Sequence, residues 1–98
     1  MVREDLTAPQ QVVQACHACL EAGDSFTGWV KESPVFLVLL GAKNEKKLKK
    51  AAEELVAAGI ELKEFYEPDI GNELTAICSE PIYGTKRERF RKYQLLGK

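Results

Sequence analysis

The fold is decided by the stretch YEPDIGNELTAICSEP, residues 66–81. An alternating strand that begins near Ile60 ends here at a polar hinge, residues 67–73, and a second strand leaves the hinge at Leu74. The hinge is short enough for an antiparallel return, and it carries three carboxylates and an asparagine beside a proline and a glycine. Because loops on the rim of a rigid sheet often hold the functional residues of α/β domains, the hinge is the first candidate for a site.

A capping box predicts the first helix. Thr7 and Gln10 have the required spacing, Pro9 lies in the first turn, and the helix is expected to run to about Ala22 and to stop at Gly23. Its apolar stripe is expected to pack on the sheet, and comprises Val12, Val13, Ala15, Cys16, Cys19 and Leu20. A polar ridge is expected on its other side, formed by Gln10, Gln14, His17 and Glu21.

A continuous apolar run, residues 35–40, lies between Pro34 and Gly41 and predicts a strand covered on both faces. Asn44 then caps a second helix that runs to about Ala58, where Gly59 ends it. The apolar stripe predicted for this helix comprises Leu48, Ala51, Ala52, Leu55 and Val56. A right-handed parallel crossover is expected from the strand at 35–40 to the strand at 60–66.

The two ends of the chain complete the pattern. Residues 2–6 are expected to be the end of a strand, and a second capping box at residues 85–88 predicts a C-terminal helix that carries Phe90 and Tyr93. The resulting order predicts an α/β fold, a three-layer α/β/α sandwich with a mixed four-stranded sheet whose last strand is antiparallel. Ninety-eight residues are expected to form a single domain, residues 1–98.

Basic residues form two clusters although the net charge is only −1. One cluster comprises Lys43, Lys46, Lys47, Lys49 and Lys50, and the other Lys86, Arg87, Arg89, Arg91, Lys92 and Lys98. Such clusters are either solvated helix faces or a surface for a polyanion. No apolar run is long enough to cross a membrane and no signal peptide is visible, so we expect a cytoplasmic protein with no membrane partner.

Cys16 and Cys19 flank the only histidine, His17, in a CxxC pattern. The pair lies well inside the predicted helix, where it gains little from the helix N-terminus, so core packing is expected for both thiols. A redox or zinc site remains a weaker alternative, and no metal or cofactor is expected. His17 is either a general base or an ordinary partly buried side chain. Asp69 is either a functional carboxylate or the stabiliser of an Asx-type turn at the hinge.

Several short motifs, taken in order, resemble the archaeal and eukaryotic-type peptidyl-tRNA hydrolases. They are the Arg-x-Asp of residues 3–5, the Gln-x-x-His-Ala of residues 14–18, Trp29 before the apolar run, the Asp-x-Gly of residues 69–71, and the Thr-Ala-Ile of residues 75–77 that ends at Pro81. The resemblance covers nearly the whole chain.

The resemblance implies hydrolysis of the ester that joins a peptide to the terminal ribose of tRNA. Such an enzyme must orient a water, stabilise an oxyanion and hold phosphates. It implies catalytic roles for His17, Asp69 and Thr75. The residues that it places at the substrate are Gln10, Gln14, Gly71 and Asn72. It also implies tRNA or peptidyl-tRNA as a partner and a homodimer.

The chain departs from the family pattern at two places. The family has a lysine where this chain has Gln10, and it has a longer loop after the Asp-x-Gly, where this chain has Asn72 and Glu73. A neutral glutamine does not supply the point charge of a lysine, and Glu73 adds negative charge. Two functions therefore stand side by side, an esterase acting on peptidyl-tRNA and a non-catalytic binding module on the same fold.

Overall fold

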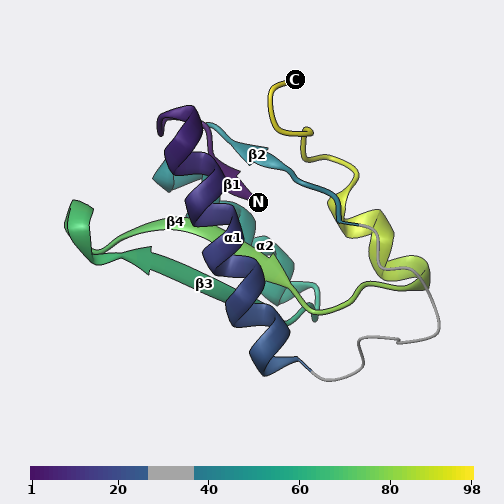
Figure 1. The fold of residues 1–98 in the computed structure, drawn as a ribbon. Coiled ribbons are helices and arrows are strands. Elements are labelled where there is room, and N and C mark those ends of the chain that lie inside the picture. The colour runs from purple at the N-terminus through teal and green to yellow at the C-terminus, as the bar shows by residue number, and fades with distance from the viewer. Residues whose placement is uncertain (27–36) are drawn as a thin grey trace.

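The computed structural model describes residues 1–26 and 37–98. Figure 1 shows the elements, which confirm the predicted order. They are β1 (Val2–Arg3), α1 (Ala8–Ser25), β2 (Gly41–Ala42), α2 (Glu45–Ala57), β3 (Leu62–Glu67), the 3₁₀ helix η1 (Pro68–Ile70), β4 (Glu73–Ser79) and the 3₁₀ helix η2 (Gly84–Phe90).

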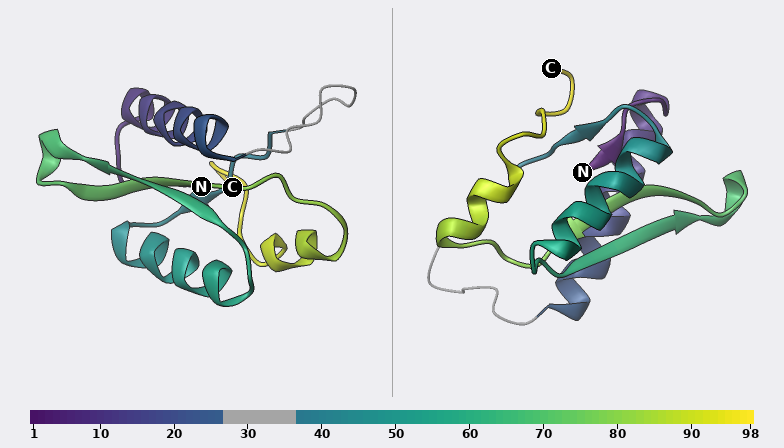
Figure 2. Two further views of the ribbon diagram at one scale, coloured as in Figure 1. Left: turned by 90° about the horizontal axis from the view of Figure 1, so that it is seen from below. Right: turned by 180° about the vertical axis from the view of Figure 1, so that it is seen from behind.

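The four strands form one mixed sheet, as predicted, and their order in it is β2-β1-β4-β3. β1 pairs with β2 in parallel, and β4 runs antiparallel to both β1 and β3. Helix α1 lies on one face of this sheet, and α2 lies on the opposite face with η2 beside it (Figure 2). β2 and β3 lie at opposite edges of the sheet, so the expected crossover through α2 joins strands that are not neighbours.

The two faces of the sheet carry two small cores. Between the sheet and α2, a cluster that includes Leu48, Leu55, Ile60 and Leu74 excludes water almost completely. Leu48 and Leu55 come from the apolar stripe predicted for this helix, and Asn44 caps it, its Oδ1 accepting from the backbone N–H of Lys47 at 3.0 Å. The second core, under α1, is smaller, with Val2, Ala18 and Ala76 at its centre.

Helix α1 turns the face opposite to the predicted one toward the sheet. The capping box of Thr7 and Gln10 forms as expected, but the helix continues past Gly23 to Ser25. Its buried residues are Gln14, Ala18 and Ala22, whereas the apolar stripe that was predicted to pack on the sheet is largely exposed. The expectation was wrong because a buried glutamine can replace an apolar contact when both ends of its amide find hydrogen-bond partners.

The apolar run before Gly41 is not a buried strand in the part that the structure describes. Leu37, Val38 and Leu39 are exposed and without regular structure. Only Leu40 at the end of the run is buried and paired, in an antiparallel bridge with Leu95, and the regular strand β2 follows it and pairs with β1. The first part of the predicted strand, together with Trp29, lies outside the described residues. β2 lies at the sheet edge beside the C-terminal segment, where the N–H of Gly41 donates to the carbonyl oxygen of Gln94 at 3.0 Å.

The C-terminal helix differs from its prediction. It is the 3₁₀ helix η2, which begins after Tyr83, and no side chain caps it. The predicted capping box at Thr85 therefore does not form. Phe90 and Tyr93 nevertheless pack against the core under α2, so the apolar anchors were correctly identified although the type of helix was not.

Candidate functional site

A β-bulge in β4 directs Thr75 toward α1. Phe65 pairs with Ala76 and Tyr66 pairs with Leu74, so Thr75 is an extra residue with no partner on β3. Ala76 packs against Ala18 of α1, and the hydroxyl of Thr75 also contacts α1, so two successive residues of β4 face the same helix. Bulges bend a strand and change the direction in which its side chains point. Here the bulge places the Thr75 hydroxyl against α1, at Gln14.

A buried glutamine joins that hydroxyl to the hinge. Thr75 Oγ1 donates to Oε1 of Gln14 at 2.7 Å, and Nε2 of Gln14 donates to Oε2 of Glu67 at 2.9 Å. Gln14 is 6% exposed and Thr75 is completely buried. The amide therefore has both a donor and an acceptor partner, which offsets the cost of burying it.

Glu67 connects this network to η1. Its Oε1 accepts from the backbone N–H of Asp69 at 3.2 Å, and its other oxygen accepts from Gln14. The amide of Gln14 is the main cause of the lowered pKa of Glu67, followed by the Asp69 N–H, and the His17 imidazole contributes further. Glu67 thus stays ionised beside α1 at neutral pH.

His17 lies on the same side of the sheet, stacked on Phe65 of β3. The two ring centroids are 4.6 Å apart and the rings are nearly parallel, with an interplanar angle of 3°. His17 is exposed on α1, one turn after Gln14. The stack holds the imidazole against the sheet close to Glu67 and leaves it accessible from solvent.

The hinge itself supplies Asp69, Gly71 and Asn72, all exposed. Asp69 is in η1, and Gly71 and Asn72 both have positive φ angles, 77° and 59°. This left-handed backbone explains the glycine, and asparagine tolerates it better than most residues. The backbone N–H of Asp69 donates to Glu67, and the Asp69 side chain is exposed.

The structure thus gathers only some of the predicted site residues. Gln14 bonds to Thr75, and Asp69 is linked to Gln14 through Glu67. His17 lies one turn along α1, where it stacks on Phe65. Gln10 serves the helix start, where its Oε1 accepts from the N–H of Thr7 at 3.0 Å.

Sequence reasoning did not assign the roles of Glu67 and Phe65. Glu67 was counted only as one of the hinge acids and Phe65 only as a residue of an alternating strand. Their signal was available in the alternation of β3, which places both on the same face of the sheet.

The sequence analysis also did not predict that Arg3 would be the centre of a network of ion pairs. Its Nε and Nη2 donate to the two carboxylate oxygens of Asp5, each at 2.9 Å, and its Nη1 donates to Oε1 of Glu73 at 2.7 Å. The bonds with Arg3 are the largest cause of the lowered pKa of Asp5. Arg3 therefore ties β1 to the strand end that follows the hinge.

The cysteines do not form the core expected of the CxxC. Cys16 is exposed on the outer side of α1, which contradicts the prediction, and Cys19 is half-buried. Burial raises the pKa of Cys78, also half-buried, to about 11, so this thiol stays protonated at neutral pH. Across residues 1–26 and 37–98, no three His, Cys, Asp or Glu side chains gather as metal ligands would.

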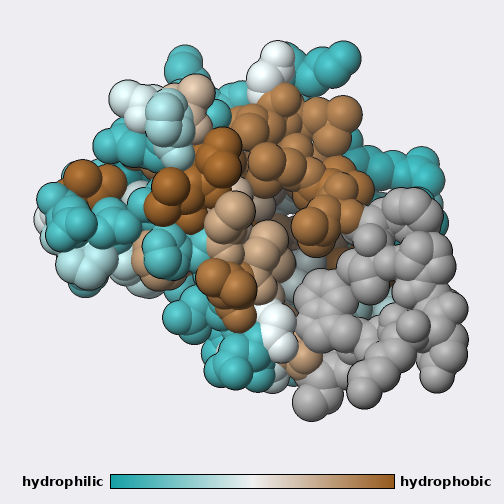
Figure 3. Space-filling model, viewed as in Figure 1, coloured by the Kyte–Doolittle hydropathy of each residue, from teal (hydrophilic) through white to brown (hydrophobic). Residues whose placement is uncertain are grey.

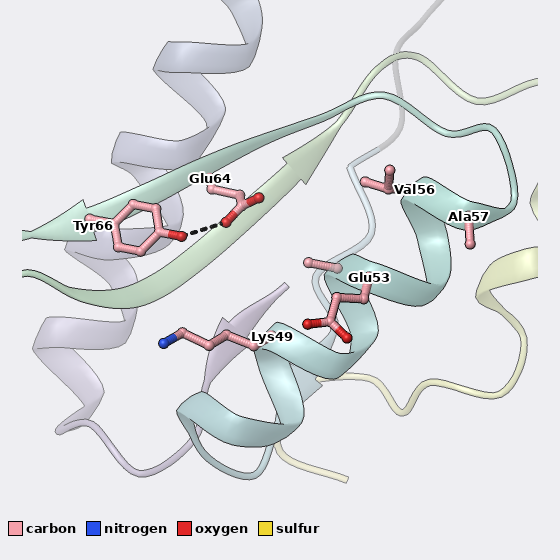
Figure 4. Close-up of a pocket in the computed structure, with 7 residues that line it drawn as sticks. Lys49, Glu53, Val56, Ala57, Glu64 and Tyr66 are labelled. Atoms are coloured by element: carbon pink, nitrogen blue, oxygen red, sulfur yellow. Dashed lines mark hydrogen bonds between the residues drawn. The ribbon is translucent and has the colours of Figure 1, made fainter.

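A hollow of about 500 Å³ lies elsewhere, between α2 and β3 (Figure 4). Tyr66 and Glu64 point into it from β3, and the Tyr66 hydroxyl donates to Oε2 of Glu64 at 2.8 Å. Lys49 and Glu53 line it from α2. Because α1 covers the opposite face of the sheet, this hollow does not hold the cluster around His17.

The two basic clusters come together on the α2 side. The lysines of α2 are exposed, as are most basic residues of η2, and the two helices lie side by side in Figure 2. Glu54 of α2 joins them, because its Oε1 accepts from Lys92 Nζ at 3.2 Å and from the Tyr93 hydroxyl at 3.0 Å. We call the side of the sheet that carries α2 and η2 the basic side, and it lies across the sheet from α1 and His17.

The chain was compared with known proteins. No protein-family model matches the sequence, and no curated protein matches it either. Within the described part of the chain, none of the helices combines the length and the apolar character needed to span a bilayer.

Proposed function

We propose that this domain is an ester hydrolase of the peptidyl-tRNA hydrolase type, acting on peptidyl-tRNA or a related aminoacyl ester. The observation that carries the proposal is the Gln14 bridge between Thr75 and Glu67, beside the His17–Phe65 stack. The bridge joins Gln14 of α1 to Thr75 of β4, two residues that the family resemblance singles out, and Glu67 of the hinge adds a carboxylate that the resemblance does not include.

The arrangement supports a general-base mechanism. His17 accepts a proton from a water, the water oxygen attacks the ester carbonyl carbon, and the bond to the ribose oxygen breaks as that oxygen receives the proton. The Glu67 carboxylate stabilises the imidazolium that forms, consistent with the charge interaction between these two groups. The products are a free carboxylate and a ribose hydroxyl.

Thr75 acts through Gln14 in this scheme. Its hydroxyl is completely buried and already donates to the glutamine, so it is a positioning group that does not reach the substrate. Asp69, exposed at the hinge, is the second group that can contact the substrate or its water. Gly71 and Asn72 offer their exposed backbone on the same rim.

A peptidyl-tRNA hydrolysis assay tests the proposal. His17→Ala and Asp69→Ala should each lower kcat/KM, His17→Ala by about 10²–10⁴-fold, the range for loss of a general base. Asp24→Ala is the matched control, because Asp24 is an exposed carboxylate at the far end of α1. Equal turnover by the wild type and the His17 variant would remove the histidine from the mechanism.

A non-catalytic binding module is the second candidate, and two observations favour it. Gln10 stands where the family has a lysine, and its amide oxygen accepts a hydrogen bond at the start of the helix. Glu73, at the end of the hinge, forms an ion pair with Arg3. Under this reading the chain binds tRNA without cleaving it. Saturable tRNA binding with no ester cleavage by the wild type would decide for the module.

Binding of tRNA is assessed by its dependence on salt. If the basic side contacts phosphates, log Kd should depend linearly on log salt concentration, and Lys46→Ala and Lys47→Ala should each reduce the slope by about 1. Lys63→Ala provides the control, because Lys63 lies on β3 outside both clusters. A slope that is unchanged in the α2 variants would exclude these lysines from the interface.

A further inference from the structure

The two edges of the sheet differ. β2, at one edge, lies against the C-terminal segment, through the Leu40–Leu95 bridge and the bond from the Gly41 N–H to the Gln94 carbonyl oxygen. β3 forms the other edge and pairs with β4 on one side. It contains no proline, and the extra residue of the bulge lies in β4, so neither of these common devices disrupts the β3 edge. An edge of this kind can accept an extended chain as a further strand.

The bonds between β3 and β4 determine which backbone groups of β3 face outward. The Glu61 carbonyl oxygen accepts from the Glu80 N–H at 2.9 Å, and the Phe65 carbonyl oxygen accepts from the Thr75 hydroxyl at 3.3 Å. Backbone groups alternate in direction along an antiparallel strand, so the odd-numbered residues direct theirs toward β4. The residues whose N–H and C=O point to the open edge are therefore Leu62, Glu64 and Tyr66. In the sheet formed by the described residues, no strand lies beyond β3 to pair with them.

The side chains of the same three residues point toward α2. Leu62 packs against the core under α2, and Glu64 and Tyr66 point into the hollow of about 500 Å³ between β3 and α2 (Figure 4). The Tyr66 hydroxyl, which donates to Oε2 of Glu64 at 2.8 Å, holds that carboxylate at the hollow. From α2, Val56 adds an exposed apolar wall and Glu53 a second carboxylate. A strand added at the edge would thus place every second side chain over this hollow.

The charges around the hollow favour a cationic side chain. Glu53 and Glu64 supply two carboxylates. The lysine that also lines the hollow, Lys49, already forms an ion pair with Glu45, with 3.5 Å between Nζ and Oε2. The stem of an arginine or lysine can lie along the apolar wall while its charge reaches the carboxylates and the exposed ring of Tyr66.

We propose that the edge of β3 binds an extended peptide of another protein as an antiparallel fifth strand, and that an arginine or lysine of the peptide enters the hollow. The peptide residue opposite Glu64 has its side chain on the same face as Glu64, so the basic side chain belongs at this position. The residues two places before and after it lie over Leu62 and Tyr66, where apolar side chains fit. A second copy of β3 fits the edge less well, because this strand carries two glutamates and one lysine and would oppose its own net charge.

This peptide site lies apart from the other exposed features of the molecule. Figure 3 shows apolar side chains gathered over α1 and over the segment to its right, whereas the rim at the left, where the hinge end of β3 lies, is largely hydrophilic. Main-chain hydrogen bonds and charge, rather than an apolar patch, therefore recognise the peptide. The hollow lies across the sheet from α1 and His17, so the inference does not depend on the proposed ester hydrolysis.

Fluorescence anisotropy with the full chain tests the proposal. The probe is a fluorescein-labelled peptide of sequence TVTRTVT, whose arginine and two valines share one face when it is extended. Replacing its arginine by glutamate should weaken binding by about 10-fold or more, because attraction becomes repulsion. Methylating the backbone nitrogen of that arginine should weaken binding by a similar factor, because the N–H that donates to the Glu64 carbonyl oxygen is lost.

Variants of the protein test the hollow. Glu53→Gln and Glu64→Gln should each weaken binding of the arginine peptide by about 3–5-fold, the effect of one exposed ion pair. Both side chains are exposed, and circular dichroism verifies that the variants fold. Glu21→Gln is the matched control, because Glu21 is an exposed glutamate on α1, across the sheet, and its loss should leave the Kd unchanged.

Amide hydrogen exchange locates the bound peptide. The N–H groups of Leu62, Glu64 and Tyr66 should exchange about 10-fold more slowly with the arginine peptide bound, whereas those of Lys63 and Phe65, which point toward β4, should change little. Absence of binding at protein concentrations up to about 1 mM overturns the proposal. So does equal binding of the glutamate peptide, or protection confined to α1 or η2. Protection of the three outward amides by raising the protein concentration without peptide would assign the edge to a second copy and would also overturn it.

Discussion

The bond between Thr75 and Gln14 can be measured as a contribution to stability. Thr75→Val keeps the shape of the side chain but removes the hydroxyl that donates to Gln14 Oε1 at 2.7 Å. The carbonyl oxygen of this buried amide then has no donor, which costs about 1–3 kcal/mol. At a typical total stability of about 5–15 kcal/mol, that loss shifts a denaturation midpoint clearly.

Urea denaturation followed by circular dichroism provides the measurement. Thr75→Val should lower the midpoint without changing the slope, since the surface exposed on unfolding is nearly the same. Thr85→Val is the control: it makes the same chemical change at an exposed threonine and should alter the free energy of unfolding by less than about 0.5 kcal/mol.

A double-mutant cycle then separates the bond from its surroundings. Gln14→Leu combined with Thr75→Val removes both polar groups, so the double variant should be more stable than the sum of the single losses predicts. The coupling should be about 0.5–3 kcal/mol. Strict additivity, or a single-variant loss no larger than that of the control, would refute the account of the buried bridge.

Three further changes test other parts of the structure. Gly71→Ala should lower the free energy of unfolding by about 1–2 kcal/mol, because φ is +77° at this position. Gly23→Ala should raise it by about 0.5–1 kcal/mol, because Gly23 lies inside α1 and has free space around it. Thermal unfolding should show a lower midpoint for the first variant and a higher midpoint for the second. Arg3→Lys should cost about 1–3 kcal/mol in urea denaturation because an ammonium cannot reproduce the guanidinium's paired bonds, and wild-type stability would contradict the central role given to that side chain. The pKa of Glu67 lies below its ordinary value of 4.5 in the folded chain, so the contribution of the Glu67 carboxylate to folding stability is present above pH 4.5 and is lost as the pH falls through the folded pKa. The difference in free energy of unfolding between wild type and Glu67→Gln should therefore shrink on acidification. A difference that does not depend on pH would reject this linkage.

Local signals predicted the elements well. The caps at Thr7 and Asn44 and the apolar spacing of α2 each depend on residues that are close in sequence. The local sequence was therefore sufficient to predict these helices. The antiparallel return after the hinge follows from its short length. These features defined the class of fold and placed Asp69 correctly on the rim.

The face of α1 that packs on the sheet could not be predicted in the same way. Burial of Gln14 depends on Thr75 and Glu67, which are distant in sequence, and on a bulge that no local pattern reveals. Hydrophobic periodicity assumes that apolar residues lie inside, and the apolar stripe of α1, which is largely exposed, breaks that assumption. The same limit applies to Leu37–Leu39, whose composition favours a buried strand.

The position of β1 also has a consequence for how the chain assembles. This strand is central in the sheet, and one of its two partners is β4, which is distant from it in the sequence. The N–H of Ile77 donates to the carbonyl oxygen of Met1 at 2.8 Å. Contacts between distant segments carry the largest loop-closure cost and slow folding. β1 is synthesised before β4 and must therefore wait for it before the two can pair. Pulsed hydrogen exchange should show protection of the Ile77 amide after the β3–β4 hairpin, and simultaneous protection would argue against this order.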